Sequence, residues 1–302
     1  MGDDAKMQNA ADRKRRGVIC AVFIALFTLG AWLIWGNSAL TTSEITIHDA
    51  RIPSGFNGFC IAQVSDLHDA SFGDGNAALI SLLKDAKPDI IAITGDLIDS
   101  NRTDIDAAIA FAQCAVEIAP VYYVTGNHEG ALMEYWILRE GLSQAGVHIL
   151  SDTAEALVKD GDTINIIGLD DPNFATREDV ARGFDAMIRG KLDNLVRADE
   201  YNILLVHRPE LIESYCAGGA DLALCGHAHG GQIRLPFIGG VIAPGQGFFP
   251  EYDSGLYTVG DTSMVVSRGL GNSVISLRVN NRPEVVMITL ESGAEFPRAV
   301  VT

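Results

Sequence analysis

Five short apolar runs, each ending abruptly in a polar cluster, constrain this chain more than any other feature of its sequence. The runs are residues 59–64, 90–94, 121–125, 202–206 and 221–225. Each has the length and continuity of a buried β-strand. Helical spacing is found between them, at residues 76–86, 104–119 and 131–145. Strands that alternate with helices predict an α/β sheet core covered by helices.

Three further segments have the pattern of antiparallel strands. They are residues 154–169, 256–267 and 284–290. We therefore expect one continuous α/β domain with no internal repeats and no low-complexity tract.

Polar side chains follow each of the five strand runs, at the point where the run ends. They are Asp66 and His68, Asp96, Asn127 with His128 and Glu129, His207, and His227 with His229. In open α/β sheets, ligand sites lie beyond the carboxyl ends of the strands. The sequence therefore predicts a single site at which these side chains converge.

The types of these side chains indicate a metal site. Imidazole, carboxylate and amide donors without a thiolate suit divalent Mn, Fe, Co or Zn rather than a structural cysteine-rich zinc site. Asp66 and His68 are two residues apart, so an extended chain points both to one face. Seven such donors exceed what one tetrahedral ion takes. Two ions that share one carboxylate, typically about 3.5–4 Å apart, are the economical arrangement.

These residues form an ordered motif set. Asp66-x-His68, Gly95-Asp96, Gly126-Asn127-His128-Glu129, His207 and Gly226-His227-x-His229 together resemble the calcineurin-like metallophosphoesterases. Residues 226–236, 267–271 and 282–284 are similar to the YkuE/YaeI-like branch, whose members are membrane-associated phosphodiesterases. The resemblance implies a four-layer α/β/β/α sandwich with two mixed sheets, preceded by one N-terminal transmembrane helix.

The same resemblance implies a role for each site residue. One ion would be held by Asp66, His68, Asp96 and His229, and the other by Asp96, Asn127, His207 and His227. Asp96 would then bridge the ions. A hydroxide between the two metals would attack phosphorus, and His128 would act as general acid toward the leaving oxygen.

Several other polar residues have simpler interpretations. His48 and His148 match no motif. Glu129 is expected to support the site or the start of a helix, not to bind metal, because acidic residues favour helix N-termini. The Asp170-Asp171 pair precedes Pro172-Asn173, which favours a turn. The five cysteines show no paired spacing and are expected to be small buried hydrophobes, with the redox compartment left open.

The N-terminus predicts a membrane segment. Residues 17–36 are uncharged, and the basic run 13–16 lies directly before them. About 20 residues suffice to span a bilayer as a helix. Trp32 and Trp35 lie at the far end, where an aromatic belt is expected. A cleaved signal peptide has a shorter apolar core, so we expect an uncleaved single-pass anchor in the cell membrane.

The basic flank also bears on sidedness and export. By the positive-inside rule it stays cytoplasmic, which places the catalytic domain on the extracytoplasmic side. The Arg15-Arg16 pair also allows export by a twin-arginine signal.

The chain then divides into a basic cytoplasmic segment, an anchor or uncleaved signal, a linker and a metallophosphoesterase domain. These cover residues 1–16, 17–36, 37–44 and 45–302. Beyond residue 37 there are 17 basic and 36 acidic side chains, a formal charge of about −19. Nucleic acid is not an expected partner, because binding it requires a basic surface. The oligomeric state is left open.

Three functions are consistent with these features. The first is a phosphodiesterase or phosphomonoesterase. The second is a lipid-linked pyrophosphate hydrolase of the UDP-diacylglucosamine type, which requires a site facing the cytoplasm. The third is a catalytically silent metal-binding scaffold, which the complete motif set disfavours. The apolar stretch 236–250 is either a packed loop or a contact with a membrane or lipid tail.

Overall fold

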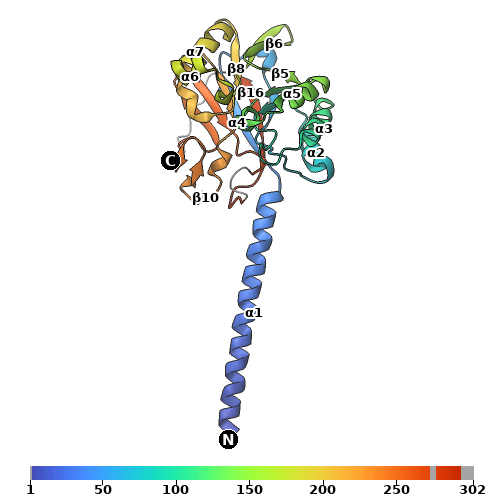
Figure 1. Cartoon of the computed structure of the whole chain (residues 1–302), viewed down its shortest axis with the longest axis vertical. Coiled ribbons are helices and arrows are strands. Elements are labelled where there is room, and N and C mark those ends of the chain that lie inside the picture. Colours follow the sequence, from blue (N-terminus) through green and yellow to red (C-terminus); the bar gives the residue numbers. More distant parts are fainter. Residues whose placement is uncertain (1, 273–276, 294–302) are drawn as a thin grey trace.

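Two six-stranded sheets packed face to face form the centre of the molecule, and helices cover the outer face of each (Figure 1). The computed structural model describes residues 2–272 and 277–293. The four layers confirm the predicted α/β/β/α sandwich.

The first sheet is mixed, with strand order β1-β16-β2-β3-β4-β5. Its strands are β1 (Thr41–Asp49), β16 (Glu284–Ser292), β2 (Phe59–Val64), β3 (Ile90–Thr94), β4 (Val121–Val124) and β5 (His148–Ile149). β1 and β16 are parallel, β16 and β2 are antiparallel, and β2 to β5 are parallel. The ends of β2 to β4 that precede the polar clusters therefore lie at one edge.

The second sheet is also mixed, with strand order β14-β15-β9-β8-β7-β6. Its strands are β14 (Gly255–Val259), β15 (Thr262–Val266), β9 (Leu222–Cys225), β8 (Tyr201–Leu205), β7 (Asp162–Gly168) and β6 (Thr153–Lys159). β6 pairs with β7 and β14 with β15 in antiparallel fashion, as predicted, while the four central strands are parallel.

Three apolar cores hold the layers together. Residues that alternate along each strand face either the partner sheet or the covering helices. In β2, for example, Ile61 lies in the core between the sheets and Ala62 in the core under the helices. The third core joins the second sheet to its helices through residues such as Leu192.

The helices are divided between the two faces. The first sheet is covered by α2 (Ala77–Ala86), α3 (Ile105–Val116) and α5 (Tyr135–Gln144), with the short α4 (Asn127–Ala131) at a strand end. On the second sheet lie α6 (Arg177–Arg182), α7 (Phe184–Leu195) and α8 (Ile212–Ala217). Short 3-10 turns are η1 (Ser54–Phe56), η2 (Asp74–Asn76), η3 (Pro172–Phe174), η4 (Pro209–Leu211) and η5 (His229–Gly231).

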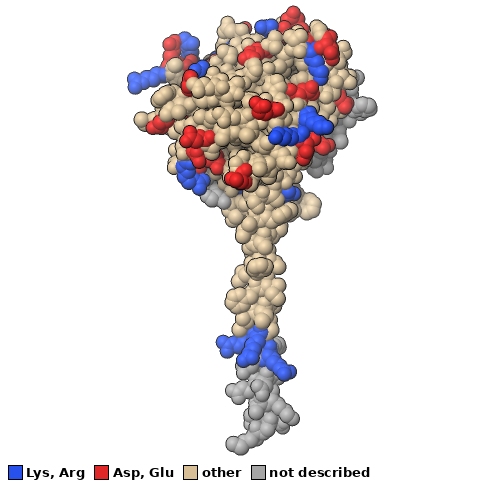
Figure 2. All heavy atoms as spheres, turned by 90° about the vertical axis from the view of Figure 1, so that its right-hand side faces the viewer, with Lys and Arg blue, Asp and Glu red and all other residues tan. Residues whose placement is uncertain are grey.

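Helix α1 (Gly2–Ser38) projects from one end of the sandwich (Figure 1). Its part from Arg15 to Ser38 is long and apolar enough to cross a membrane. Figure 2 shows that the helix surface carries no charged side chain between its basic cluster and the body.

The predicted linker over 37–44 differs from the structure. Helix α1 continues to Ser38 and β1 begins at Thr41, so only two residues separate them. The polar side chains of β1 hide the apolar pattern by which a strand is predicted. All nine of its residues pair with β16, and this pairing makes the segment a strand. The folded body therefore starts before residue 45.

The prediction that the cysteines are buried is correct for Cys225 alone. Cys60 and Cys216 are partly exposed, and Cys20 and Cys114 are exposed. Cys114 lies off the buried stripe of α3, and Cys20 lies on the surface of α1.

Four very short strands follow η5. They pair as β10 (Arg234–Leu235) with β11 (Gly239–Gly240) and as β12 (Ile242–Ala243) with β13 (Gly247–Phe248). They lie at the end of the body from which α1 leaves (Figure 1).

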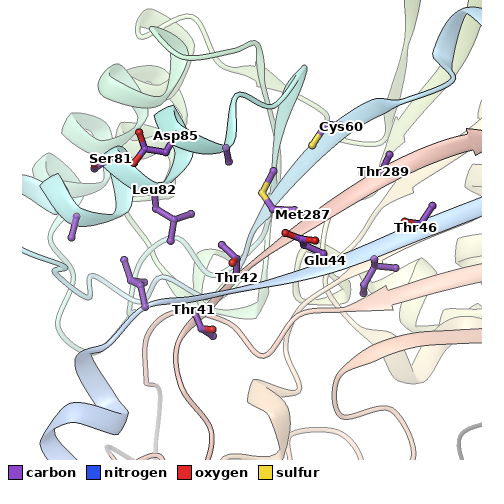
Figure 3. A pocket seen from close by; sticks show the side chains of 14 residues that line it. Thr41, Thr42, Glu44, Thr46, Cys60, Ser81, Leu82, Asp85, Met287 and Thr289 are labelled. Atoms are coloured by element: carbon purple, nitrogen blue, oxygen red, sulfur yellow. The ribbon is translucent and has the colours of Figure 1, made fainter.

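A large hollow of about 1000 Å³ lies on the outer side of the first sheet, beside α2 (Figure 3). Its walls include Thr42 and Glu44 of β1, Asp85 of α2 and Met287 of β16. None of its lining residues belongs to the polar clusters at the strand ends. It is therefore separate from the predicted site.

The core between the sheets should dominate stability. Ile203 of β8 is fully buried there, so Ile203→Ala should lower the free energy of unfolding by about 2–5 kcal/mol. Val158 of β6 is exposed, and Val158→Ala should change it by less than about 0.5 kcal/mol. Denaturant unfolding of the full chain in detergent measures both; equal losses would contradict this assignment of the core.

Candidate metal centre

The predicted site residues meet at one place between the two sheets. Asp66 follows β2, Asp96 follows β3 and Asn127 begins α4 after β4; His207 follows β8, and His227 and His229 follow β9. The first three come from one sheet and the histidines after residue 200 from the other. The site thus lies at the seam between the two sheets, and both sheets contribute side chains to it.

The backbone at five of these positions is in the left-handed region. The φ angles are 50° at Asp66, 47° at His68, 51° at Asp96, 66° at His227 and 48° at His229. Such conformations cost non-glycine residues about 1–3 kcal/mol each and cluster at functional sites. The chain therefore turns sharply after each strand and directs its polar side chains into the seam.

Two groups of buried side chains among the described residues could each hold a metal ion. In each group the donor atoms lie within 4.8 Å of one another. The first contains Asp66, His68, Asp96 and His229, and the second contains Asp96, His207 and His227. Asp96 is common to both.

In the first group, two ring nitrogens face each other. Nε2 of His68 lies 3.2 Å from Nε2 of His229 and 3.5 Å from Oδ2 of Asp96. Nε2 of His229 lies 3.5 Å from Oδ1 of Asp66. All four donors therefore point into one small volume.

The second group is arranged around His207. Its Nδ1–H donates to the carbonyl oxygen of Thr94 at 2.8 Å, which directs Nε2 into the site. That Nε2 lies 3.2 Å from Oδ2 of Asp96, 3.2 Å from Oδ1 of Asn127 and 3.1 Å from Nδ1 of His227. Asn127, although an amide, thus lies where a ligand of this group would be.

The donors have the electrostatic character that a cation requires. Burial lowers the pKa of His68 to about 4 and holds the pKa values of His227 and His229 well below the usual range, so these rings are neutral and offer lone pairs. Burial also raises the pKa of Asp66 to about 6. Within the described chain, the buried Nε2 of His227 has no hydrogen-bond partner.

Asp96 and His207 form an ion pair at the centre. Burial opposes ionisation of Asp96, but His207 outweighs it and holds the pKa of the carboxyl well below its usual range. Burial alone would lower the pKa of His207, yet Asp96 raises it to about 10. A divalent cation would compete with this proton for the same lone pair. The residues present therefore fit divalent metal binding.

Comparison with known proteins identifies the family. The model of the calcineurin-like phosphoesterase family matches residues 60–231, which is more than half of the chain and includes every predicted site residue. The chain belongs to the calcineurin-like phosphoesterases. It is accordingly a metal-dependent phosphoric ester hydrolase, and the resemblance found in its motifs is confirmed.

Three relatives illustrate the branch. The uncharacterized metallophosphoesterase YkuE of Bacillus subtilis is 31% identical, over 84% of this chain and 86% of the relative. Phosphodiesterase YaeI of Escherichia coli is 30% identical, over 77% and 82%. A Bos taurus protein called transmembrane protein with metallophosphoesterase domain is 29% identical, over 84% of this chain and 57% of its own length.

His128 of this phosphoesterase lies beside the first group. Its ring packs edge-on against His68, with 4.6 Å between the centroids. The backbone N–H of Ser100 donates to its Nδ1 at 3.0 Å, and Oδ1 of Asp99 lies 3.6 Å from the same atom. A neutral ring that accepts at Nδ1 carries its proton on Nε2.

Glu129 is fully buried and holds the turns of the candidate metal centre in place. Its carboxylate accepts backbone N–H groups of Asp96 at 2.9 Å, Leu97 at 2.7 Å and Gly126 at 2.7 Å. It thereby ties the turn after β3 to the start of α4. This contact agrees with its interpretation as a supporting residue.

The other polar residues considered in the sequence have the simpler roles that were predicted for them. Asp171 caps η3 and pairs with Arg208 at 2.7 Å, which agrees with the predicted turn. His148 pairs with Glu155 at 2.8 Å on the surface, and His48 lies 3.1 Å from Glu291.

Besides Ser100, which donates to His128, the motifs missed two neighbours of the centre. Glu210 lies 3.8 Å from Nε2 of His227, and the buried Arg278 lies 3.5 Å from Nδ1 of His229. No local pattern marks either residue.

The strand directions place the centre at the end of the body where α1 enters. Ser43 of β1 lies beside Val286 of β16, which lies beside Gln63 of β2. β1 runs away from α1 and β2 runs back toward it. Asp66, three residues after Gln63, is therefore close to the level at which α1 ends.

Removing the Glu129 carboxylate should disturb the centre without removing a ligand. Glu129→Ala leaves three buried N–H groups unpaired, so we expect unfolding free energy to fall by about 3 kcal/mol and metal affinity to fall about 10–100-fold. Elemental analysis after gel filtration and thermal unfolding measure the two effects. Glu134→Ala, at an exposed position, is the matched control; unchanged metal content in Glu129→Ala would exclude this supporting role.

Proposed function

We propose that this enzyme is a dinuclear phosphodiesterase. The observation that carries the proposal is the convergence of two buried donor groups that share one carboxylate. One ion alone would leave part of this donor set without a partner. Mn, Fe, Zn and Co all suit the donors.

The two groups suggest the assignment of ligands. Asp66, His68, Asp96 and His229 would hold one ion. Asp96, Asn127, His207 and His227 would hold the other, with the amide oxygen of Asn127 completing the second group. Divalent ions in these positions supply Lewis acidity, which lowers the pKa of water and neutralises the charge of phosphate oxygens.

His128 is the proposed general acid. Ser100 supports this role because its N–H, by donating to Nδ1, leaves the ring proton on Nε2. The contact with the His68 ring keeps His128 beside the first group. A positioned imidazole that protonates a leaving oxygen contributes about 10²–10⁴-fold to the rate.

The proposed location is the cell membrane, with α1 as a single-pass anchor and the body on the extracytoplasmic side. The uncharged surface of α1 and the basic residues before it, among them Arg13, Arg15 and Arg16, support this orientation. Export by a twin-arginine signal would give the same sidedness. Residues from β1 onward would form the phosphoesterase domain.

A lipid-linked pyrophosphate is the second candidate substrate. The observation that favours it is the position of the centre at the α1 end of the body, which is the end that would face a bilayer. A nucleotide-linked lipid is cytoplasmic, however, so this candidate requires the opposite sidedness.

The diesterase proposal predicts separable effects of two substitutions. The full chain in detergent, stripped of metal, should not cleave bis-p-nitrophenyl phosphate, and Mn²⁺ should restore cleavage. Asp96→Ala should lose both metal and turnover. His128→Ala should keep its metal and lose about 10²–10⁴-fold with an alkyl leaving group, but less with p-nitrophenolate, which departs without a proton.

His148→Ala is the control, because that histidine is exposed and remote from the motifs. Equal losses of His128→Ala on both leaving groups would exclude a general acid. No turnover by the metal-loaded enzyme would favour a narrow lipid-linked substrate or a scaffold.

Sidedness can be measured through a native cysteine. Cys114 is exposed on the body, so a membrane-impermeant maleimide should label it in intact spheroplasts of a bacterial host. Because Cys60 and Cys216 are partly exposed, the test uses a Cys60→Ser/Cys216→Ser chain, in which Cys114→Ser should abolish this labelling. Labelling that requires lysis would place the body in the cytoplasm and would favour the lipid-linked pyrophosphate.

A further inference from the structure

We propose that residues 235–250, here called the apolar loop, dock on the surface of the bilayer that α1 enters and hold the metal centre against it. The proposal rests on the anchoring by α1 and adds a second membrane contact, made by the body itself.

The composition of the apolar loop is unusual for this chain. None of its sixteen residues is charged, although the chain has 39 acidic and 22 basic side chains. Phe237 is fully exposed, and Ile238, Phe248 and Phe249 are 62%, 73% and 63% exposed. Single exposed apolar residues are ordinary, but a contiguous exposed patch marks an interaction surface.

The apolar loop has a defined conformation with its own hydrogen bonds. The first of its two small hairpins is held by the Asp253 carboxylate, which accepts the backbone N–H of Gly240 at 2.6 Å and pairs with Arg234 at 3.1 Å. At the second hairpin, the backbone N–H of Phe249 donates to the carbonyl of Val241 at 2.8 Å. Phe237 and Phe249 have φ angles of 67° and 54°, in the left-handed region. The fold thus holds aromatic side chains in water at a conformational cost, which argues for a partner.

A chain of contacts connects the loop to the end of α1. The backbone N–H of Arg234 donates to the carbonyl of Val279 at 3.0 Å. The adjacent Arg278 exchanges two hydrogen bonds with Asn37 of α1, at 2.7 and 2.9 Å. The guanidinium of Arg282 lies 4.6 Å from the ring centroid of Trp35.

These contacts restrict rotation of the body about α1. Only two residues separate α1 from β1, so the body cannot swing on a long linker. In Figure 1, β10 lies at the end of the body from which α1 projects. The face that carries the loop is therefore turned toward the bilayer that surrounds α1.

A lipid surface fits the loop better than a protein partner. The patch is aromatic and uncharged, and it lies at the end of the body from which the apolar span of α1 projects. Aromatic side chains concentrate at the membrane–water interface. A protein partner would not explain why the patch lies at the end of the body from which α1 projects.

Docking would bring the metal centre to the lipid. η5, which contains His229, leads directly into β10, and the backbone of Gly231 packs against Gly240. Phosphoesters whose apolar part stays in the bilayer are then the substrate class within reach of the centre. Soluble diesters would still be cleaved, because docking changes no ligand.

Tryptophan quenching in the full chain tests the docking. Phe248→Trp and Val158→Trp proteins are reconstituted into phosphatidylcholine/phosphatidylglycerol vesicles with or without bromine on the acyl chains. Val158 is exposed on β6, at the far end of the body. Both variants keep the native Trp32, Trp35 and Trp136, so the comparison isolates the new side chain.

We expect the added emission of Phe248→Trp to be blue-shifted and quenched by the brominated lipids, and that of Val158→Trp to be unaffected. Equal, water-like emission from both variants would overturn the docking. If the introduced indole of Phe248→Trp is protected from aqueous acrylamide but not quenched by bromine, protein covers the loop, and the docking is overturned as well.

The same samples separate docking from the underlying proposals. Quenching of native Trp32 and Trp35 reports insertion of α1, and cleavage of bis-p-nitrophenyl phosphate reports the metal centre. If α1 insertion and diester cleavage are both normal but the introduced indole of Phe248→Trp stays in water, the docking proposal alone is wrong. Phe237→Ser/Phe248→Ser/Phe249→Ser should keep its activity on the soluble diester, and loss of that activity would contradict the claim that the loop acts only on membrane contact.

Discussion

The ion pair between Asp96 and His207 is the interaction on which the centre depends, because it joins the two sheets. Asp96 follows β3 in one sheet and His207 follows β8 in the other. The same carboxylate accepts the backbone N–H of His128 at 2.8 Å, which fixes the start of α4. One buried carboxylate thus contacts His207 across the two sheets and fixes the position of His128, the proposed general acid. Glu129 in turn accepts the backbone N–H of Asp96.

The sequence predicted the strands that carry the site because those strands are buried on both faces. The runs 59–64 and 90–94 coincide with β2 and β3, since nearly every residue in them is apolar. The predicted linker over 37–44 includes the first four residues of β1, because an edge strand with alternating polar residues resembles a linker. Ser100, Glu210 and Arg278 could not be found, because each reaches the centre through tertiary contacts that no local spacing encodes.

Helix α1 and the centre are connected through strand direction. A span of apolar residues indicates where a chain meets the bilayer, but it does not indicate which end of the following domain faces the lipid. The parallel pairing of β1 with β16 and the antiparallel pairing of β16 with β2 supply that information. They return the carboxyl end of β2, and with it Asp66, to the level at which α1 ends.

Binding of a cation and stability of the fold should be coupled in this molecule. The centre buries carboxylates and imidazoles together and holds five of these residues in left-handed conformations, both of which oppose folding. The unfolded chain cannot reproduce this set of donors. A divalent ion that binds only the folded state therefore stabilises it in proportion to the logarithm of its concentration over Kd. The apolar cores on either side of the seam supply the stability that allows the donors to be gathered there before the ion arrives.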